Sequence, residues 1–127
     1  MHVLLLTISY KSKFNPLSAP FFRDQALALK NNGFEVGVLC ALPVSFKSIW
    51  KNKLFTFDEE SYLDEGIHTL VSPFISIPKT PNRARRIRLE KGKELFRKYI
   101  NENGRPDVIH VHSFLAGELA IWIKEEY

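Results

Sequence analysis

The chain is patterned as short apolar runs separated by segments of helical periodicity. The apolar runs predict β-strands at residues 2–9, 34–42, 66–74 and 107–112. The first run, HVLLLTIS, is apolar without alternation, which is typical of a strand covered on both faces of a parallel sheet. The segment between the second and third runs is less regular, and it predicts a loop or short helix followed by a strand near 54–58.

Helices are predicted between and after these strands. The segment FFRDQALALKNN has apolar and small residues at helical spacing. Ser18 is a candidate cap for the start of this helix, Pro20 suits its first turn, and Gly33 suits its end. A long, strongly basic helix is predicted from about Asn82 to Asn103, and residues 114–126 predict a last helix with one apolar face.

The order of these elements, β-α-β-(β)-β-α-β-α, predicts the fold class. The first strand, helix and strand form a βαβ unit, whose strands pair in parallel through a right-handed crossover. We therefore expect an α/β protein with a Rossmann-like, open, doubly wound and mainly parallel sheet that carries helices on both faces. Residues 1–127 are expected to form one domain, incomplete because no strand follows the last helix.

Composition and charge limit which cellular compartment and which classes of partner we expect. The net charge of +4 favours anionic partners such as phosphorylated ligands or lipid headgroups. Nucleic acid is not expected, because no recognised binding motif or interleaved stacking pattern is present. The single cysteine, Cys40, lies in an apolar run, which predicts a buried thiol in a reducing compartment. No stretch approaches the roughly 20 apolar residues of a membrane span, so a cytoplasmic protein is expected.

The strand end that carries two histidines is the first candidate site. In open α/β sheets, ligands bind beyond the carboxyl ends of the strands. His110 and His112 share one face of their predicted strand, and His112 lies nearer that end. Ser113 and Gly117 follow, so a ligand can approach the backbone, and the next helix offers N–H groups to an anion or a sugar hydroxyl. The alternative is that both imidazoles are packed and hydrogen-bonded within the fold.

The loop after the first strand is the second part of this candidate site. It contains Asn15, Ser18 and Ala19, and Arg23 follows in the helix. The loop lacks a G-x-G-x-x-G dinucleotide fingerprint, so a nicotinamide cofactor is not expected. No metal is expected either, because no Cys, His or Asp cluster completes a ligand set around the two histidines. Arg23 has an alternative role on the helix surface or in an internal hydrogen bond.

Two further features admit more than one role. Ser113 follows His112 directly, but no nucleophile-elbow pattern surrounds it, so helix capping is the better interpretation. The basic run NRARRIRLEKGKELFRK is either a solvated helix face or a surface that docks on anionic lipid. The candidate membrane-facing residues in this run are Arg83, Arg85, Arg86 and Arg88.

Two segments together resemble glycosyltransferase family 4. MHVLLLTISYKSKFNPLSAPFFRDQALALKNNGFEVGVL is similar to the opening strand, variable loop, helix and second strand of that family, and RPDVIHVHSFLAG is similar to its P-D-V-I-H-x-H strand and the following turn. The resemblance implies a GT-B architecture, retention of anomeric configuration and no metal requirement. His112 matches the second histidine of the motif, which faces the cleft near the transferred sugar. Leu17, Ser18 and Ala19 match the segment near the donor phosphates, where many members have glycine.

The resemblance also implies a role for the chain. It would be the acceptor-binding, amino-terminal part of a retaining enzyme in polysaccharide or glycolipid biosynthesis. The full enzyme would move a sugar from a nucleotide-sugar co-substrate to a glycan or lipid-linked acceptor. If the basic helix docks on lipid, the enzyme is peripheral at the inner face of the plasma membrane. The donor-binding domain, with its basic phosphate clamp and paired glutamates, is absent, so we expect this chain alone to be inactive. The alternative is a non-catalytic Rossmann-like binding or regulatory module, or a remnant.

Overall fold

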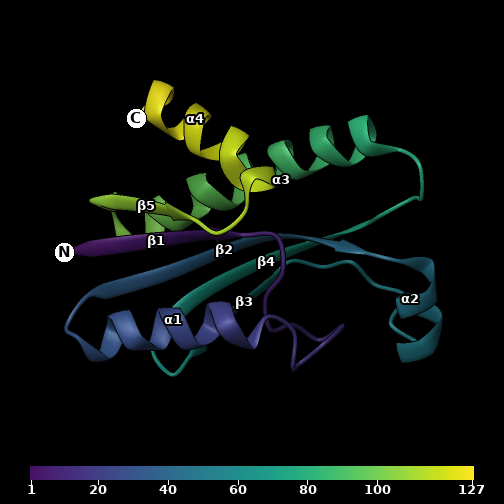
Figure 1. Cartoon of the computed structure of the whole chain (residues 1–127), viewed down its shortest axis with the longest axis horizontal. Helices are drawn as coiled ribbons and strands as arrows, with labels where there is room; N and C mark the ends of the chain where they lie inside the picture. Colours follow the sequence, from purple (N-terminus) through teal and green to yellow (C-terminus); the bar gives the residue numbers. More distant parts are fainter.

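The centre of the molecule is a five-stranded, mostly parallel β-sheet with the strand order β3-β4-β2-β1-β5 (Figure 1). The computed structural model describes residues 1–127. The strands are β1 His2–Thr7, β2 Glu35–Val44, β3 Glu60–Asp64, β4 Ile67–Ile75 and β5 Val108–Val111. The helices are α1 Pro20–Asn31, α2 Phe46–Asn52, α3 Pro81–Asn103 and α4 Gly117–Glu126, and a 3-10 turn, η1, spans Phe114–Ala116.

The sheet topology reverses direction at β1. Strand β1 pairs in parallel with both β2 and β5, and β2 pairs in parallel with β4. The chain therefore proceeds outward from β1 through β2 to β4 and then crosses back to β5 on the other side of β1. Only β3 is antiparallel. The mainly parallel α/β sheet is confirmed, and the arrangement is consistent with a Rossmann-like fold.

Helices cover both faces of the sheet, as predicted. Alternate strand residues point to opposite faces, so Leu5 and Cys40 pack with Ala26 of α1, whereas Leu4 packs with Phe96 of α3. Figure 1 shows α3 and α4 on one side of the sheet and α1 on the other. Cys40 is fully buried, and this burial raises the pKa of its thiol to about 12.

The prediction that Ser18 caps α1 was wrong. Ala19 precedes the helix in a left-handed conformation, with φ 51°, and no side chain caps the first turn. The Ser18 hydroxyl instead lies 2.6 Å from the Ser9 hydroxyl, within hydrogen-bond distance. Pro20 occupies the first turn as expected, and Gly33, with φ 89°, follows the end of α1 and donates its N–H to the Lys30 carbonyl at 2.9 Å.

The predicted strand near 54–58 was also wrong, because the additional strand is β3, a few residues later. Strands β3 and β4 form a hairpin through Glu65 and Gly66, whose φ angles are 50° and 86°. Two positive φ angles suit the right-handed twist of a tight hairpin. The aromatic residues of 54–58 pack as a loop: Phe57 stacks on Phe14, with ring centroids 6.0 Å apart.

Candidate functional site

A polar cavity of about 460 Å³ lies beyond the carboxyl ends of β1, β2 and β4. The loop that follows β1 and the start of α2 complete its wall. No charged side chain lines the cavity. Its polar lining consists of Ser9, Ser12, Asn15, Ser18, Ser45, Ser48 and Ser76. The cavity therefore offers hydroxyl and amide groups that both donate and accept hydrogen bonds, without a fixed charge.

The strand ends place several of these serines. Ser45 and Ser76 directly follow β2 and β4, and Ser9 comes two residues after β1. Ser45 also caps α2, because its hydroxyl accepts a hydrogen bond from the Ser48 N–H at 3.1 Å. We did not single out Ser12, Ser45, Ser48 or Ser76 from the sequence. A serine within two residues of the end of each parallel strand is the signal that would have found two of them.

The loop after β1 is held by its own hydrogen bonds. Ser12 and Asn15 exchange backbone hydrogen bonds of 3.3 and 3.2 Å, and the Asn15 side chain accepts from the Leu17 N–H at 3.1 Å. Phe14 is buried, and the Lys13 N–H donates to the Glu60 carboxylate at 3.1 Å. The wall of the cavity is thus fixed to both the hydrophobic core and β3.

His112 does not line this cavity. Its backbone N–H donates to the Leu6 carbonyl at 3.0 Å, which continues the pairing of β5 with β1. Its ring packs between two others: the centroid of Phe22 is 4.6 Å away and that of His110 is 4.5 Å away. The Nε2 atom of His112 is buried and has no hydrogen-bond partner. Burial, with a smaller contribution from His110, lowers the pKa of His112.

The other predicted site residues are distributed over neighbouring surfaces. Ser18 lines the polar cavity and also a second hollow, of about 520 Å³, together with Arg23. Ser113 caps η1, because its hydroxyl accepts from the Leu115 N–H at 3.2 Å, which confirms the capping interpretation. Gly117 is the first residue of α4, and neither Ser113 nor Gly117 lines either hollow. Asn15 and Ser18 are thus brought together, whereas His112, Ser113 and Gly117, which follow β5, do not line that cavity.

Arg23 forms an ion pair with Asp64 within the protein. Its guanidinium donates to both carboxylate oxygens of Asp64, at 2.7 and 2.9 Å, and it also contacts Glu65 at 3.3 Å. The Asp64 side chain is only 3% exposed. The hydrogen bonds from Arg23 lower the pKa of Asp64, so that carboxylate is ionised at neutral pH. This pair ties α1 to the β3–β4 hairpin, which is the internal role considered for Arg23 in the sequence.

The four arginines predicted to face a membrane do not share one free surface. Arg83 donates to the Ile75 carbonyl at 2.8 Å, and Arg85 is paired with Glu118. The Nε atom of Arg88 is buried without a hydrogen-bond partner, and burial lowers the pKa of its guanidinium. Arg86 is exposed. Most of this positive charge is therefore engaged within the chain or covered by it.

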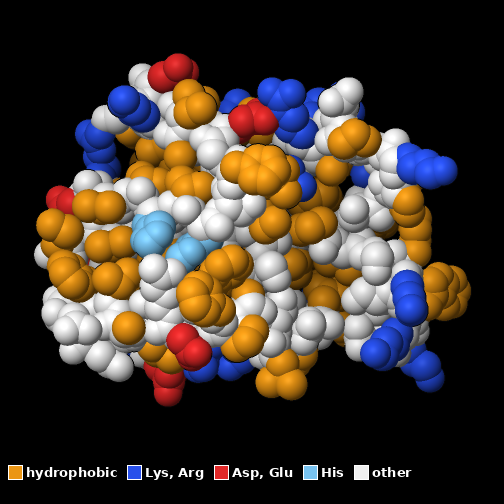
Figure 2. All heavy atoms as spheres, viewed as in Figure 1, with side chains coloured by type: hydrophobic (Ala, Val, Ile, Leu, Met, Phe, Trp, Pro, Cys, Tyr) orange, Lys and Arg blue, Asp and Glu red, His pale blue; other side chains and the backbone are white.

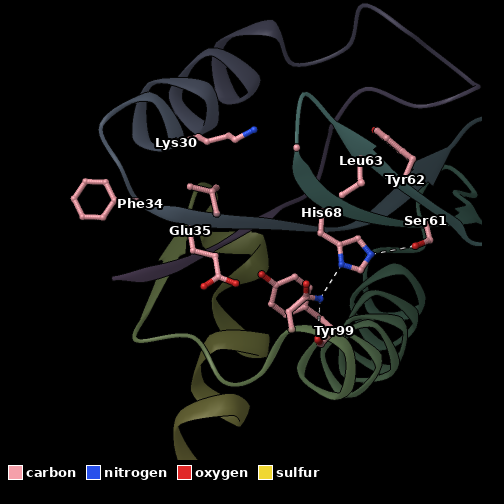
Figure 3. A pocket seen from close by; sticks show the side chains of 11 residues that line it. Lys30, Phe34, Glu35, Ser61, Tyr62, Leu63, His68 and Tyr99 are labelled. Carbon is pink, nitrogen blue, oxygen red and sulfur yellow. Dashed lines mark hydrogen bonds between the residues drawn. The ribbon is translucent and has the colours of Figure 1, made fainter.

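A larger cavity, of about 690 Å³, lies at the opposite end of the sheet, where the parallel strands β2 and β4 begin (Figure 3). His68 is its central polar residue, although no sequence motif singled it out. The Asn103 amide donates to His68 Nδ1 at 2.7 Å, while His68 Nε2 is 3.2 Å from the Ser61 hydroxyl and 3.4 Å from the Glu102 carboxylate. Both ring nitrogens thus have partners within the chain, so the network joins β3, β4 and α3.

Comparisons with known proteins add no assignment to this geometry. No protein-family model, curated protein or solved structure matches the chain. No three side chains of His, Cys, Asp or Glu gather in a way that would hold a metal ion. None of the helices has the length and apolar character needed to cross a bilayer. The fold and the site together define an α/β protein with a polar, uncharged cavity at the carboxyl ends of its parallel strands.

Proposed function

We propose that this chain is the acceptor-binding, amino-terminal part of a retaining glycosyltransferase built on the GT-B plan. The observation that carries the proposal is the uncharged cavity beyond β1, β2 and β4, with serine hydroxyls and Asn15 on its wall. It lies where open α/β sheets bind ligands. The sequence resemblance to glycosyltransferase family 4 supports the same assignment.

The lining favours a sugar over a charged ligand. A sugar hydroxyl donates and accepts hydrogen bonds, and serine and asparagine side chains satisfy both needs. Phosphates and carboxylates are recognised by arginine, lysine or clustered N–H groups, and neither arginine nor lysine lines the cavity. The acceptor is therefore a glycan or the glycan part of a lipid-linked molecule.

His112 is proposed to contact the substrates once the complete cleft is assembled. Its depressed pKa keeps the imidazole neutral at pH 7, so Nε2 accepts or donates one hydrogen bond depending on the tautomer. Nε2 is covered by the fold, so a ligand reaches it only after a local rearrangement of the side chains around it. The nucleotide-sugar donor is held by a second domain and is a co-substrate, so no cofactor is required.

Sugar binding by the cavity is directly testable. We expect amide resonances of residues 9–18 and 45–48 to shift when a panel of mono- and oligosaccharides is titrated into the labelled protein. Replacing Ser76 by leucine fills the cavity and removes a hydroxyl, so we expect binding to weaken about tenfold. Ser61→Leu is the matched control, because Ser61 lines the cavity at the other edge of the sheet.

Two outcomes would contradict the proposed acceptor site. One is the absence of shifts at millimolar concentrations of every sugar tested. The other is equal weakening by Ser76→Leu and Ser61→Leu, because the two residues line separate cavities. A non-catalytic sugar-binding module is the second candidate function, and it is favoured by the covered position of His112 Nε2.

A further inference from the structure

Helix α2 and the loop after it expose three large aromatic side chains. The exposed fractions are 50% for Phe46, 70% for Trp50 and 57% for Phe55. Trp50 and Phe55 pack edge to face, with ring centroids 5.5 Å apart. Figure 2 shows hydrophobic side chains next to Lys and Arg side chains at the end of the molecule where Figure 1 places α2. Grouped aromatic exposure of this kind marks an interaction surface.

The charged residues of the same segment are all positive. Lys47, Lys51 and Lys53 are exposed, and no acidic residue occurs between residues 46 and 57. None of the three lysines forms a salt bridge within the chain. We call residues 46–55 the aromatic–lysine tip. Its free positive charge complements an anionic partner.

The helical spacing gives this tip two adjacent stripes. Phe46 and Trp50 are four residues apart and lie on one side of α2, and Lys47 and Lys51 form the neighbouring stripe. Ile49, which is 5% exposed, lies on the side of α2 opposite the lysine stripe and is anchored in the core. The Asn52 side chain donates to the Phe14 carbonyl at 3.2 Å and fixes the end of the helix. The tip therefore presents its aromatic rings from a fixed support.

We propose that the aromatic–lysine tip docks on the surface of an anionic lipid bilayer. The aromatic rings enter the boundary between headgroups and acyl chains, where tryptophan and phenylalanine are favoured, and the lysines face the lipid phosphates. Each lysine near an anionic leaflet adds to the attraction. The same segment supplies Ser48 to the polar cavity, so docking brings the cavity close to the headgroups.

This assignment places the membrane surface on α2 instead of the α3 arginines. Arg83 and Arg85 already have partners within the chain, and Arg88 is partly covered. A lipid phosphate would have to displace those interactions, whereas the lysines of the tip are free. The proposed membrane docking does not rest on the proposed sugar transfer. Vesicle binding and sugar binding are measured separately, so either can fail while the other succeeds.

The test uses the full chain with Trp122 replaced by phenylalanine, so that Trp50 is the only tryptophan. With vesicles of equal parts phosphatidylglycerol and phosphatidylcholine, we expect co-sedimentation and a blue shift of Trp50 emission. Trp50→Ser and the double variant Lys47→Glu/Lys51→Glu should each weaken co-sedimentation about tenfold or more. The matched controls are Phe21→Ser, since Phe21 is a 74% exposed aromatic residue on α1, and Arg86→Glu on α3. Both controls should bind as the parent does.

Three results would overturn the proposal. The first is the absence of vesicle binding by the parent chain at low salt. The second is weakening by Phe21→Ser or Arg86→Glu equal to that by the tip variants. The third is a blue shift of Trp50 on adding a neutral glycan but none on adding vesicles, which would assign the rings to sugar stacking. The residues replaced in the tip variants and in the controls are exposed, whereas Trp122 is partly buried and packs against Phe96. Circular dichroism checks that each variant is folded.

Discussion

The imidazole of His112 lacks a hydrogen-bond partner at its buried Nε2 atom. Leaving a buried polar atom unsatisfied costs about 1–3 kcal/mol, so most native proteins avoid it. The ring has aromatic contacts with Phe22 and His110, but a phenyl ring would make similar contacts without the penalty. Stability alone therefore does not explain a histidine at this position, which supports a role in ligand contact.

Replacing His112 by phenylalanine tests this interpretation. We expect the free energy of unfolding at pH 8 to be unchanged or higher by about 1 kcal/mol, because the unsatisfied nitrogen is removed and the packing is kept. Urea denaturation of the two proteins measures the difference. A loss of more than about 2 kcal/mol would show that the imidazole makes a stabilising hydrogen bond, and the functional interpretation would lose its basis.

The same residue predicts a pH dependence of stability. The pKa of His112 is lowered in the folded protein, whereas an unfolded histidine titrates near about 6.5. The unfolded chain therefore binds more protons below that pH, and acidification favours unfolding. The contribution of the neutral His112 imidazole to the free energy of unfolding is complete above about pH 6.5. It is lost as the pH falls toward the pKa of His112 in the folded protein. In His112→Phe, we expect a shallower fall in unfolding free energy between pH 7.5 and 5.5. Identical slopes would contradict the burial of a neutral imidazole.

At the scale of elements, the packing of α3 on the sheet depends on one glycine. A Cβ atom on Gly37 of β2 would overlap the side chain of Tyr99. Tyr99 is 1% exposed, and its hydroxyl is hydrogen-bonded to His2 Nε2 at 2.6 Å. The absent side chain at Gly37 thus lets α3 approach β2 and joins the amino-terminal strand to the end of the helix.

Gly37→Ala should destabilise the protein by about 1–3 kcal/mol, because the tyrosine must move from a close-packed position. Tyr99→Ala should also destabilise it, through the cavity that it leaves. In the double variant the added methyl group occupies part of that cavity, so the loss of stability should be smaller than the sum of the losses in the two single variants. Chemical denaturation of the four proteins gives the coupling. Strict additivity would show that the two residues do not compete for the same space.

At the scale of the whole molecule, the missing feature is positive charge in the cavity. Glycosyl transfer requires groups that stabilise the departing nucleotide diphosphate and that hold both substrates in register. No arginine or lysine lines the cavity at the carboxyl edge. His112 also lies outside it. The proposed enzyme therefore needs a second domain to supply donor binding and charge.

We accordingly expect no glycosyl transfer by this chain alone. The measurement is turnover with a panel of nucleotide sugars and glycan or lipid-linked acceptors, followed by mass spectrometry of the products. Ser76→Leu serves as the control, because transfer that is unaffected by this change would come from a contaminating enzyme. Robust transfer by the parent chain, lost in Ser76→Leu, would contradict the requirement for a second domain.

The apolar pattern by itself determined the parallel core of the fold. Strands predicted at 34–42 and 66–74 occur at Glu35–Val44 and Ile67–Ile75, because a strand buried on both faces needs a continuous apolar run. The capping role of Ser113 also followed from local chemistry, since a cap and its partner are two or three residues apart. Signals of this kind are contained within one element.

Only the tertiary structure decided where β3 lies and which residues share a cavity. Strand β3 depends on the hairpin turn at Glu65 and Gly66 and on pairing with β4, whereas its own residues lack an apolar pattern. Ser9, Ser45 and Ser76 belong to three different strand ends, and they meet because β1, β2 and β4 are adjacent and parallel. His112 does not line that cavity, and its ring packs on Phe22 of α1. Strand order and side-chain packing depend on contacts between distant segments, and no local pattern encodes them.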